Sequence, residues 1–270
     1  MSAIDAFWTN GFAIVRDVFA PAEVARIRAR AAKHNMADLF ALPELRELIL
    51  DDRVLAIARA ILGEGELVYF GDSNALVGDT APGFHRDNAD KADGRAPDWD
   101  GRYPIIRFGL YTEEYAAQSG GLDLRRGTHA DIARRGEYVA ADTRVGDLVV
   151  WNLRILHSGN TMRLISGAAV DPGSTLGKIL RRWPLGIVRP PPEPRVALFW
   201  TYAKPGPHLD RYIAYLKTRR YALERWLAAS YSPQSIAAAA AKNVSVLSIN
   251  DDVRPEQIAL ANPDHVPLAY

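Results

Sequence analysis

The chain has 270 residues and a mass of 29.8 kDa, with 48% hydrophobic residues, 24% charged residues and a formal net charge of +1. It is long enough for one domain with a large core, and its near-neutral charge argues against a general nucleic-acid-binding protein. The absence of cysteine excludes disulfides and thiolate metal ligands and fits a reducing compartment. No signal-peptide pattern opens the sequence and no apolar run could cross a bilayer, so we expect a cytoplasmic protein without a membrane span.

The first 65 residues have mainly helical patterns. A short helix is expected before the turn at Asn10-Gly11, and a strand is expected over residues 12–15. Three further helices are expected. The first begins at Pro21, the second covers 43–50, and the third covers 54–62 and ends at Gly63. We expect these helices to form a layer over one face of a sheet.

The pattern changes to strands from Glu66 onward. Strands are expected over 67–70, 73–77, 104–111, 148–151 and 195–202, and a turn is expected over 118–121. Two irregular stretches interrupt them, and loops of this length usually have a function or are disordered. We expect residues 88–102 to form part of a substrate entrance, and residues 162–193 to be an insertion. Helices are expected over 210–229 and 236–241, followed by a surface tail over the last twenty residues.

The main chemical signal is a pair of residues, His85 and Asp87, followed 70 positions later by His157. In extended backbone, side chains at i and i+2 leave on the same side, and His157 comes after an apolar run typical of a strand. Two imidazoles and one carboxylate leave several metal positions open, which suits non-haem Fe(II). Chance alone gives roughly half a His-x-Asp match in a chain of this composition, so the motif depends on its context.

That context is a series of short motifs in a fixed order. They are residues 10–18, Gly83–Asp87, Ser119–Leu122, Arg126–His129, Gly146-Asp147 and His157–Asn160. The series, over about residues 5 to 205, resembles the phytanoyl-CoA dioxygenase-like (PhyH) family of Fe(II)/2-oxoglutarate-dependent oxygenases. Together with the order of expected elements, the resemblance implies a mainly β fold with flanking helices around a double-stranded β-helix (jelly roll, cupin-like) core. It implies one domain over 1–270, made of a helical layer 1–65, a core 66–204 and C-terminal helices 205–270.

The resemblance also implies roles for particular residues. His85, Asp87 and His157 match the iron ligands, and no catalytic residue is expected beyond them. The far carboxylate of the 2-oxoglutarate co-substrate is expected on an arginine near the start of the last core strand, because a guanidinium binds a carboxylate bidentately. Arg195 opens that strand, but it lies 38 positions after His157, a larger gap than the family has. Arg163 is the competing assignment.

Further residues are predicted to lie at the site. Asn74 and Ser158 match positions that contact the co-substrate, or they are an ordinary strand amide and a turn residue. Arg107 interrupts an apolar strand, so it faces solvent, pairs with a carboxylate, or binds a carboxylate of the substrate. Trp99 and Arg182 are further substrate-contact hypotheses. Cations near an entrance attract anions, so we expect a polar small-molecule substrate and favour an anionic one.

The function implied is that of an Fe(II)/2-oxoglutarate-dependent dioxygenase. Such an oxidoreductase uses O2 to oxidise a C–H bond, with hydroxylation as our first expectation, and releases succinate and CO2. Asp87 in the ligand set argues against halogenation, which needs an open position for halide. Two alternatives stay open: a cupin-like metalloenzyme such as an isomerase or lyase, and a non-catalytic barrel that binds a small molecule. Binding of 2-oxoglutarate would distinguish the oxygenase from both alternatives. A protein that binds no metal would indicate the non-catalytic barrel.

Overall fold

The centre of the structure is a large mixed sheet built around the longest strand, β11 (Val196–Ala203). In this computed structural model, which describes residues 4–78, 83–183, 185–191 and 194–261, β11 pairs antiparallel with β4 (Ile105–Tyr111) along one edge. Its other edge pairs with β3 (Ser73–Val77) and then β2 (Leu67–Tyr69). The sheet continues beyond β4 with β7 (Leu148–Asn152) and β1 (Phe12–Val15), and beyond β2 with the parallel strand β12 (Val244–Val246).

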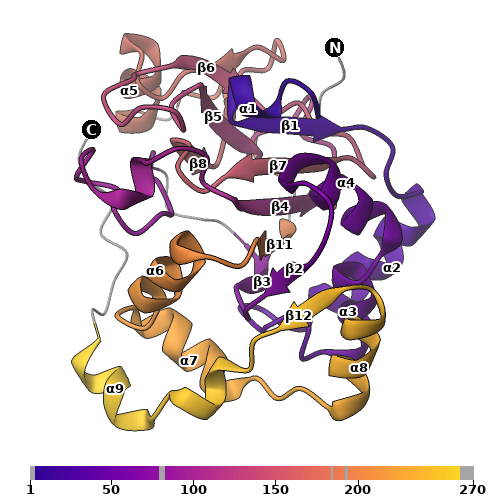
Figure 1. Ribbon diagram of the computed structural model, residues 1–270. Coiled ribbons are helices and arrows are strands. Elements are labelled where there is room, and N and C mark those ends of the chain that lie inside the picture. Colours follow the sequence, from indigo (N-terminus) through magenta and orange to yellow (C-terminus); the bar gives the residue numbers. More distant parts are fainter. Residues whose placement is uncertain (1–3, 79–82, 184, 192–193, 262–270) are drawn as a thin grey trace.

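A smaller sheet of three strands lies in the upper part of the molecule in Figure 1. Its order is β6 (Glu137–Ala140), β5 (Leu122–Arg126) and β8 (His157–Gly159), all antiparallel. The two-stranded hairpin of β9 (Met162–Arg163) and β10 (Ala169–Val170) follows β8 in the chain. The backbone of His85 pairs with His157 of β8, so the segment that carries two of the predicted metal ligands is attached to the smaller sheet.

Helices cover the large sheet on two sides (Figure 1). One group packs with the sheet in the largest hydrophobic cluster and consists of α2 (Pro21–Ala31), α3 (Pro43–Ile49), α4 (Asp52–Leu62) and α8 (Pro233–Ala241). A second cluster contains α6 (Pro207–Leu216) and α7 (Arg220–Ala228), with η2 (Ile249–Asp252) and α9 (Pro255–Leu260) beside them. The remaining helices are α1 (Phe7–Asn10), η1 (Pro97–Trp99) and α5 (Thr175–Arg182). Within the described ranges, no helix combines the length and apolar character needed to cross a membrane.

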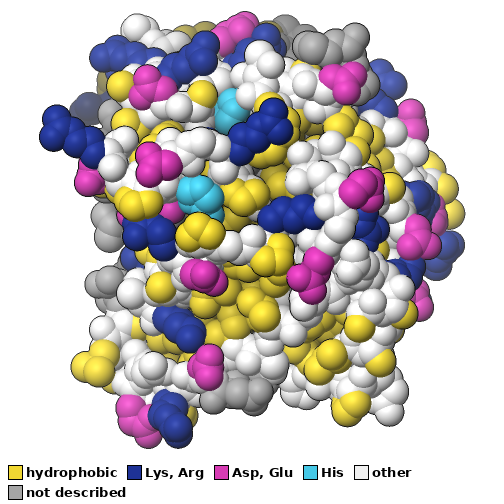
Figure 2. All heavy atoms as spheres, in the orientation of Figure 1, with side chains coloured by type: hydrophobic (Ala, Val, Ile, Leu, Met, Phe, Trp, Pro, Cys, Tyr) yellow, Lys and Arg dark blue, Asp and Glu magenta, His cyan; other side chains and the backbone are white. Residues whose placement is uncertain are grey.

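The face of the molecule shown in Figure 2 carries both positive and negative side chains. Figure 2 shows hydrophobic side chains gathered in the middle of this face, and cationic and anionic side chains interspersed around its rim. This arrangement agrees with the net charge of +1.

The turn at Gly146-Asp147 illustrates how sequence signals position the strands. Gly146 has φ +101°, and a Cβ there would lie 2.1 Å from the carbonyl oxygen of Phe19. The buried carboxylate of Asp147 accepts hydrogen bonds from the backbone N–H groups of Asp17 and Arg144, at 2.9 and 2.8 Å. Only glycine fits this close approach without strain. The turn therefore attaches β7 to the segment after β1, which sets the edge of the large sheet.

Most predicted elements are present, but β6 and β12 were not expected, and four other predictions differ from the structure. The strand over 148–152 does not itself carry His157, because the chain turns over 153–156 and His157 begins β8 in the smaller sheet. The described part of the stretch 162–193 contains β9, β10 and α5, so it is more regular than expected. The expected helix over 210–229 is two helices that break at Arg219, whose backbone is extended. The expected tail contains α9, and its part beyond residue 261 lies outside the described residues.

Candidate metal centre

Three side chains that can bind a metal converge where the two sheets meet. The backbone N–H groups of His85 and His157 each donate to the other residue's carbonyl oxygen, at 2.9 and 3.0 Å. The N–H of Asp87 donates to the carbonyl oxygen of Leu153 at 3.0 Å. One ligand atom from each of His85, Asp87 and His157 lies within 4.8 Å of the others. Backbone pairing therefore brings together a His/Asp pair and a histidine that are 70 residues apart in sequence.

Hydrogen bonds orient both imidazole rings toward the carboxylate. Nδ1 of His85 lies 3.0 Å from the carbonyl oxygen of Gly83, and Nδ1 of His157 lies 3.1 Å from that of Ile155. A carbonyl oxygen only accepts, so we assign the proton to Nδ1 in both rings, which leaves the Nε2 lone pairs for a ligand. These Nε2 atoms lie 3.6 Å and 3.4 Å from the two oxygens of Asp87.

The surroundings of His157 favour its neutral form. Burial lowers the pKa of His157 to about 3, and the nearby charge of Asp87 opposes that shift only in part. The ring of Trp151 packs against it, with ring centroids 5.6 Å apart. Because a metal binds the deprotonated imidazole, this site has a ready donor at neutral pH. Two imidazoles and one carboxylate form a donor set suited to a divalent metal such as Fe(II).

The guanidinium of Arg107 connects Asp87 to a second, fully buried carboxylate. Its Nη1 lies 2.8 Å from Asp87 Oδ2, and its Nη2 lies 2.5 Å from Asp72 Oδ2. Asp72 also accepts hydrogen bonds from Thr201 and Tyr212, and pairs with Arg225 at 3.4 Å. Burial alone would raise the pKa of Asp72, but the charges of Arg107 and Arg225 outweigh it and lower that pKa. Of the alternatives for Arg107, pairing with a carboxylate is therefore present in the structure. A contact between Arg107 and the substrate stays a prediction.

A cavity of about 200 Å³ opens beside the two histidines. Its wall includes His85, His157, Asn74, Tyr111, Arg195 and Phe199. Asn74 lies on β3, Tyr111 on β4 and Phe199 on β11, and these strands lie side by side in the large sheet. The cavity therefore extends from the two histidines across the face of that sheet.

Arg195 places a buried cation at this cavity. The residue is 1% exposed, and its guanidinium lies 5.8 Å from the ring centroid of Tyr111. Burial raises the pKa of Tyr111 to about 12, even though the charge of Arg195 acts in the opposite direction. The competitor Arg163 is bound elsewhere: it donates to the carbonyl oxygens of Tyr115 and Gly167 and pairs with Asp142. Of the two arginines, Arg195 is the one at the cavity wall.

Of the other residues predicted at the site, some line the cavity and others lie outside it. Asn74, on β3, lines the cavity. Ser158 does not line it, and its hydroxyl accepts a hydrogen bond from the N–H of Gly83 at 3.1 Å. Trp99 packs against two arginines outside the cavity, and Arg182 is exposed on α5. The roles of Ser158, Trp99 and Arg182 stay predictions.

Sequence reasoning missed Asp72 and Tyr111. Asp72 follows the apolar run 67–70 closely, and an acid in such a place needs a buried partner. Tyr111 lies four positions after Arg107 in one strand, so both side chains are on the same face, and both line the cavity. The alternation of β4 was a signal for Tyr111, whereas the pairing of Asp72 with Arg107 depends on sheet register.

Comparison with known proteins gives structural but not sequence relatives. No family model matches the chain, and no curated protein matches it. HygX from Streptomyces hygroscopicus, solved with nickel and 2-oxoglutarate bound, is similar with a TM-score of 0.52 and 20% identity over 74% of this chain and 85% of that chain. The non-heme monooxygenase ThoJ in complex with nickel is similar with a TM-score of 0.54 and 13% identity, over 75% of this chain and 77% of that chain.

EvdMO1 is similar with a TM-score of 0.53 and 18% identity over 76% of this chain. The match spans about half of EvdMO1, 49% of its length. At these identities the likeness establishes the fold. The chain therefore has a fold found in non-haem metalloenzymes, some of which are solved with 2-oxoglutarate bound.

Proposed function

We propose that the protein is a non-haem Fe(II)/2-oxoglutarate-dependent dioxygenase with His85, Asp87 and His157 as its metal ligands. The observation that carries this proposal is the convergence of these three donors within 4.8 Å, beside a cavity with a buried arginine in its wall. The HygX structure with nickel and 2-oxoglutarate bound supports it, because the two chains share a fold. On this proposal the two sheets are the halves of a PhyH-like double-stranded β-helix, within one oxygenase domain.

The co-substrate would occupy the cavity between the metal and Arg195. A guanidinium offers paired donors to a carboxylate, and burial strengthens such a charge-assisted contact. Arg195 would hold the far carboxylate of 2-oxoglutarate, and the amide of Asn74, on the same wall, would donate to one of its oxygens. Ser158 would act indirectly, because its hydroxyl holds the backbone of Gly83 two residues before His85.

The residues around the centre have separable tasks. Fe(II) with 2-oxoglutarate and O2 supplies the oxidising power for a C–H bond, with release of succinate and CO2. The carbonyl oxygens of Gly83 and Ile155 hold the imidazoles in orientation, and Arg107 holds one oxygen of Asp87. Trp151 and Phe199 exclude water from one side of the cavity. The substrate would be a polar small molecule, and hydroxylation is the reaction that we propose first.

The test is anaerobic titration of the full chain with Fe(II) and 2-oxoglutarate. We expect a weak visible charge-transfer band and, after O2 is added, release of succinate. His85→Ala and Asp87→Ala should lose metal, band and succinate, whereas His34→Ala should behave as wild type because His34 pairs with Glu44 away from the site. Arg195→Gln should weaken 2-oxoglutarate binding without loss of metal, and Arg163→Gln should not.

The same titration separates the alternatives. Metal binding without 2-oxoglutarate binding would favour the cupin-like isomerase or lyase. A protein that binds no metal, and alanine variants identical to wild type, would favour a non-catalytic small-molecule-binding barrel. Either result refutes the oxygenase proposal.

A further inference from the structure

A second cavity lies behind the segment that carries His85 and Asp87. Its volume is about 650 Å³, within the range of small-molecule sites. Four arginines line it (Arg86, Arg125, Arg134 and Arg135), and we call it the arginine cavity. The residues that line it differ from those that line the cavity at the metal centre, so both can be occupied at once.

Backbone alternation separates the two cavities. Arg86 lies between His85 and Asp87 in extended backbone, so its side chain leaves on the opposite face. Leu156, which also lines the arginine cavity, precedes His157 in the same way. An occupant of the arginine cavity would therefore contact the other side of the segments that carry the metal ligands.

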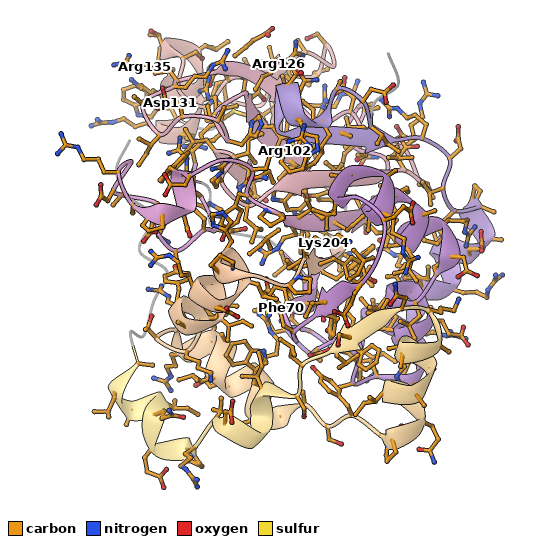
Figure 3. All side chains as sticks on the ribbon, viewed as in Figure 1. Phe70, Arg102, Arg126, Asp131, Arg135 and Lys204 are labelled. Carbon is orange, nitrogen blue, oxygen red and sulfur yellow. The ribbon has the colours of Figure 1, made fainter. Side chains whose placement is uncertain are left out.

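The lining of the arginine cavity carries excess positive charge. Its one carboxylate, Asp171, forms a two-point ion pair with Arg125 at 2.9 and 2.6 Å. Arg134 and Arg135 are exposed, and in the part of the chain that the structure describes neither forms an ion pair. Figure 3 labels Arg135 and Asp131 in the upper part of the molecule, where the turn after β5 leads into β6. Two cations are thus available to a ligand.

Several contacts hold this lining in place. The guanidinium of Arg125 lies over the ring of Phe84 at 4.7 Å and near that of Tyr138 at 5.6 Å. Gly173 permits this position, because a Cβ there would lie 2.9 Å from Arg125 Nη2. Arg134 packs over Gly127, where a Cβ would lie 2.9 Å from its Cζ atom. Arg125 is therefore held in place by Phe84, Tyr138 and Asp171, which come from separate segments of the chain.

We propose that the arginine cavity binds the anionic group of a small organic molecule, either a phosphate or a carboxylate. Arginine forks match the oxygens of both groups, and the apolar side chains of Ile132 and Leu156 would pack against the organic part. Gly173 and Ser174, at the start of α5, also line the cavity, but their N–H groups already donate to Asp171, so the arginines supply the donors. This site is independent of the metal centre and of the oxygenase proposal.

The experiment is calorimetric titration of the full chain at low ionic strength with phenyl phosphate, phenylacetate and neutral benzyl alcohol. We expect at least one anion to bind with a Kd below about 1 mM, and benzyl alcohol not to bind. The double variant Arg134→Gln/Arg135→Gln should weaken anion binding about tenfold, since it removes two solvent-exposed charge contacts that each contribute a few-fold in affinity. Binding should also weaken as salt is added.

Arg126→Gln is the matched control. Arg126 is exposed and next to Arg125, but it lies near Glu137 at 3.5 Å and does not line the arginine cavity. Its removal changes the net charge of the same turn region and should leave the Kd unchanged. Binding of one anion only assigns the site to that chemistry. The proposal fails if neither anion binds, if the double variant binds like wild type, or if Arg126→Gln weakens binding equally. The titration uses neither Fe(II) nor 2-oxoglutarate, so its failure is distinguishable from failure of the oxygenase proposal.

Discussion

Asp123→Asn should change how the stability of the protein depends on pH. Asp123 lies on β5, is fully buried, and accepts a hydrogen bond from the hydroxyl of Tyr138 at 2.8 Å. Burial raises the pKa of Asp123 to about 7, although that hydrogen bond acts in the opposite direction. Between the two pKa values, the carboxyl of Asp123 is therefore protonated in the folded protein but ionised in the unfolded chain, in which its pKa is about 3.9.

The size of the effect follows from the two pKa values. Below about pH 4 the carboxyl is protonated in both states and has no pH-dependent cost. As the pH rises from about 4 to about 7, only the folded state holds the proton, so the free energy of unfolding falls. Each pKa unit corresponds to about 1.36 kcal/mol, which gives a total cost of roughly 4 kcal/mol above pH 7. Between pH 5 and pH 8 the loss is about 2–3 kcal/mol.

The assay is urea unfolding of wild type and Asp123→Asn at pH 5 and pH 8. Asparagine is neutral at both pH values and can still accept the hydrogen bond from Tyr138. From pH 5 to pH 8, the free energy of unfolding of wild type should therefore fall by about 2–3 kcal/mol more than that of the variant. Asp17→Asn is the control, because Asp17 is exposed at φ 54°, a conformation that asparagine adopts readily. Parallel pH dependence of wild type and Asp123→Asn would refute the reasoning.

Three further predictions concern stability. Arg107→Met should lower the free energy of unfolding in urea by about 3–5 kcal/mol, because it leaves two carboxylates without their shared cation. The control Arg220→Met removes an exposed ion pair and should cost under about 1 kcal/mol. Gly146→Ala should cost about 3 kcal/mol and lower Tm, while Gly101→Ala, with open space around it, should cost about 1 kcal/mol. Ser174→Ala removes the cap of α5 and should speed its amide hydrogen exchange roughly fivefold. Equal effects within either pair, or unchanged exchange in α5, would contradict these arguments.

The sequence predicted local structure well where signals were strong and adjacent. Pro21 and Gly63 mark helix ends that the structure has, and the strand over 12–15 agrees to the residue. β6 and β12 were missed because both are short, and β12 pairs with a strand far away in sequence. α5 was missed because Gly177 and the neighbouring prolines obscure its helical pattern.

The site was predicted only as far as its motif reached. The spacing of His85 and Asp87 indicated a shared side, which agrees with the structure, but the meeting with His157 depends on backbone pairing between segments far apart in sequence. The same holds for Arg195, which lines the cavity although it lies 38 positions after His157 in the sequence. The network of Asp72, Arg107 and Asp87 could not be predicted, since it depends on which strands are neighbours.

The reciprocal backbone bonds between His85 and His157 have a consequence for how a metal would be acquired. Because main-chain pairing sets the spacing of the rings, the polypeptide can finish folding first and take up its ion afterwards. Chelators would then strip the ion without denaturing the chain. Which divalent ion is incorporated would follow cellular supply and the Irving–Williams order, so protein made in bacteria could carry nickel or zinc until it is reloaded.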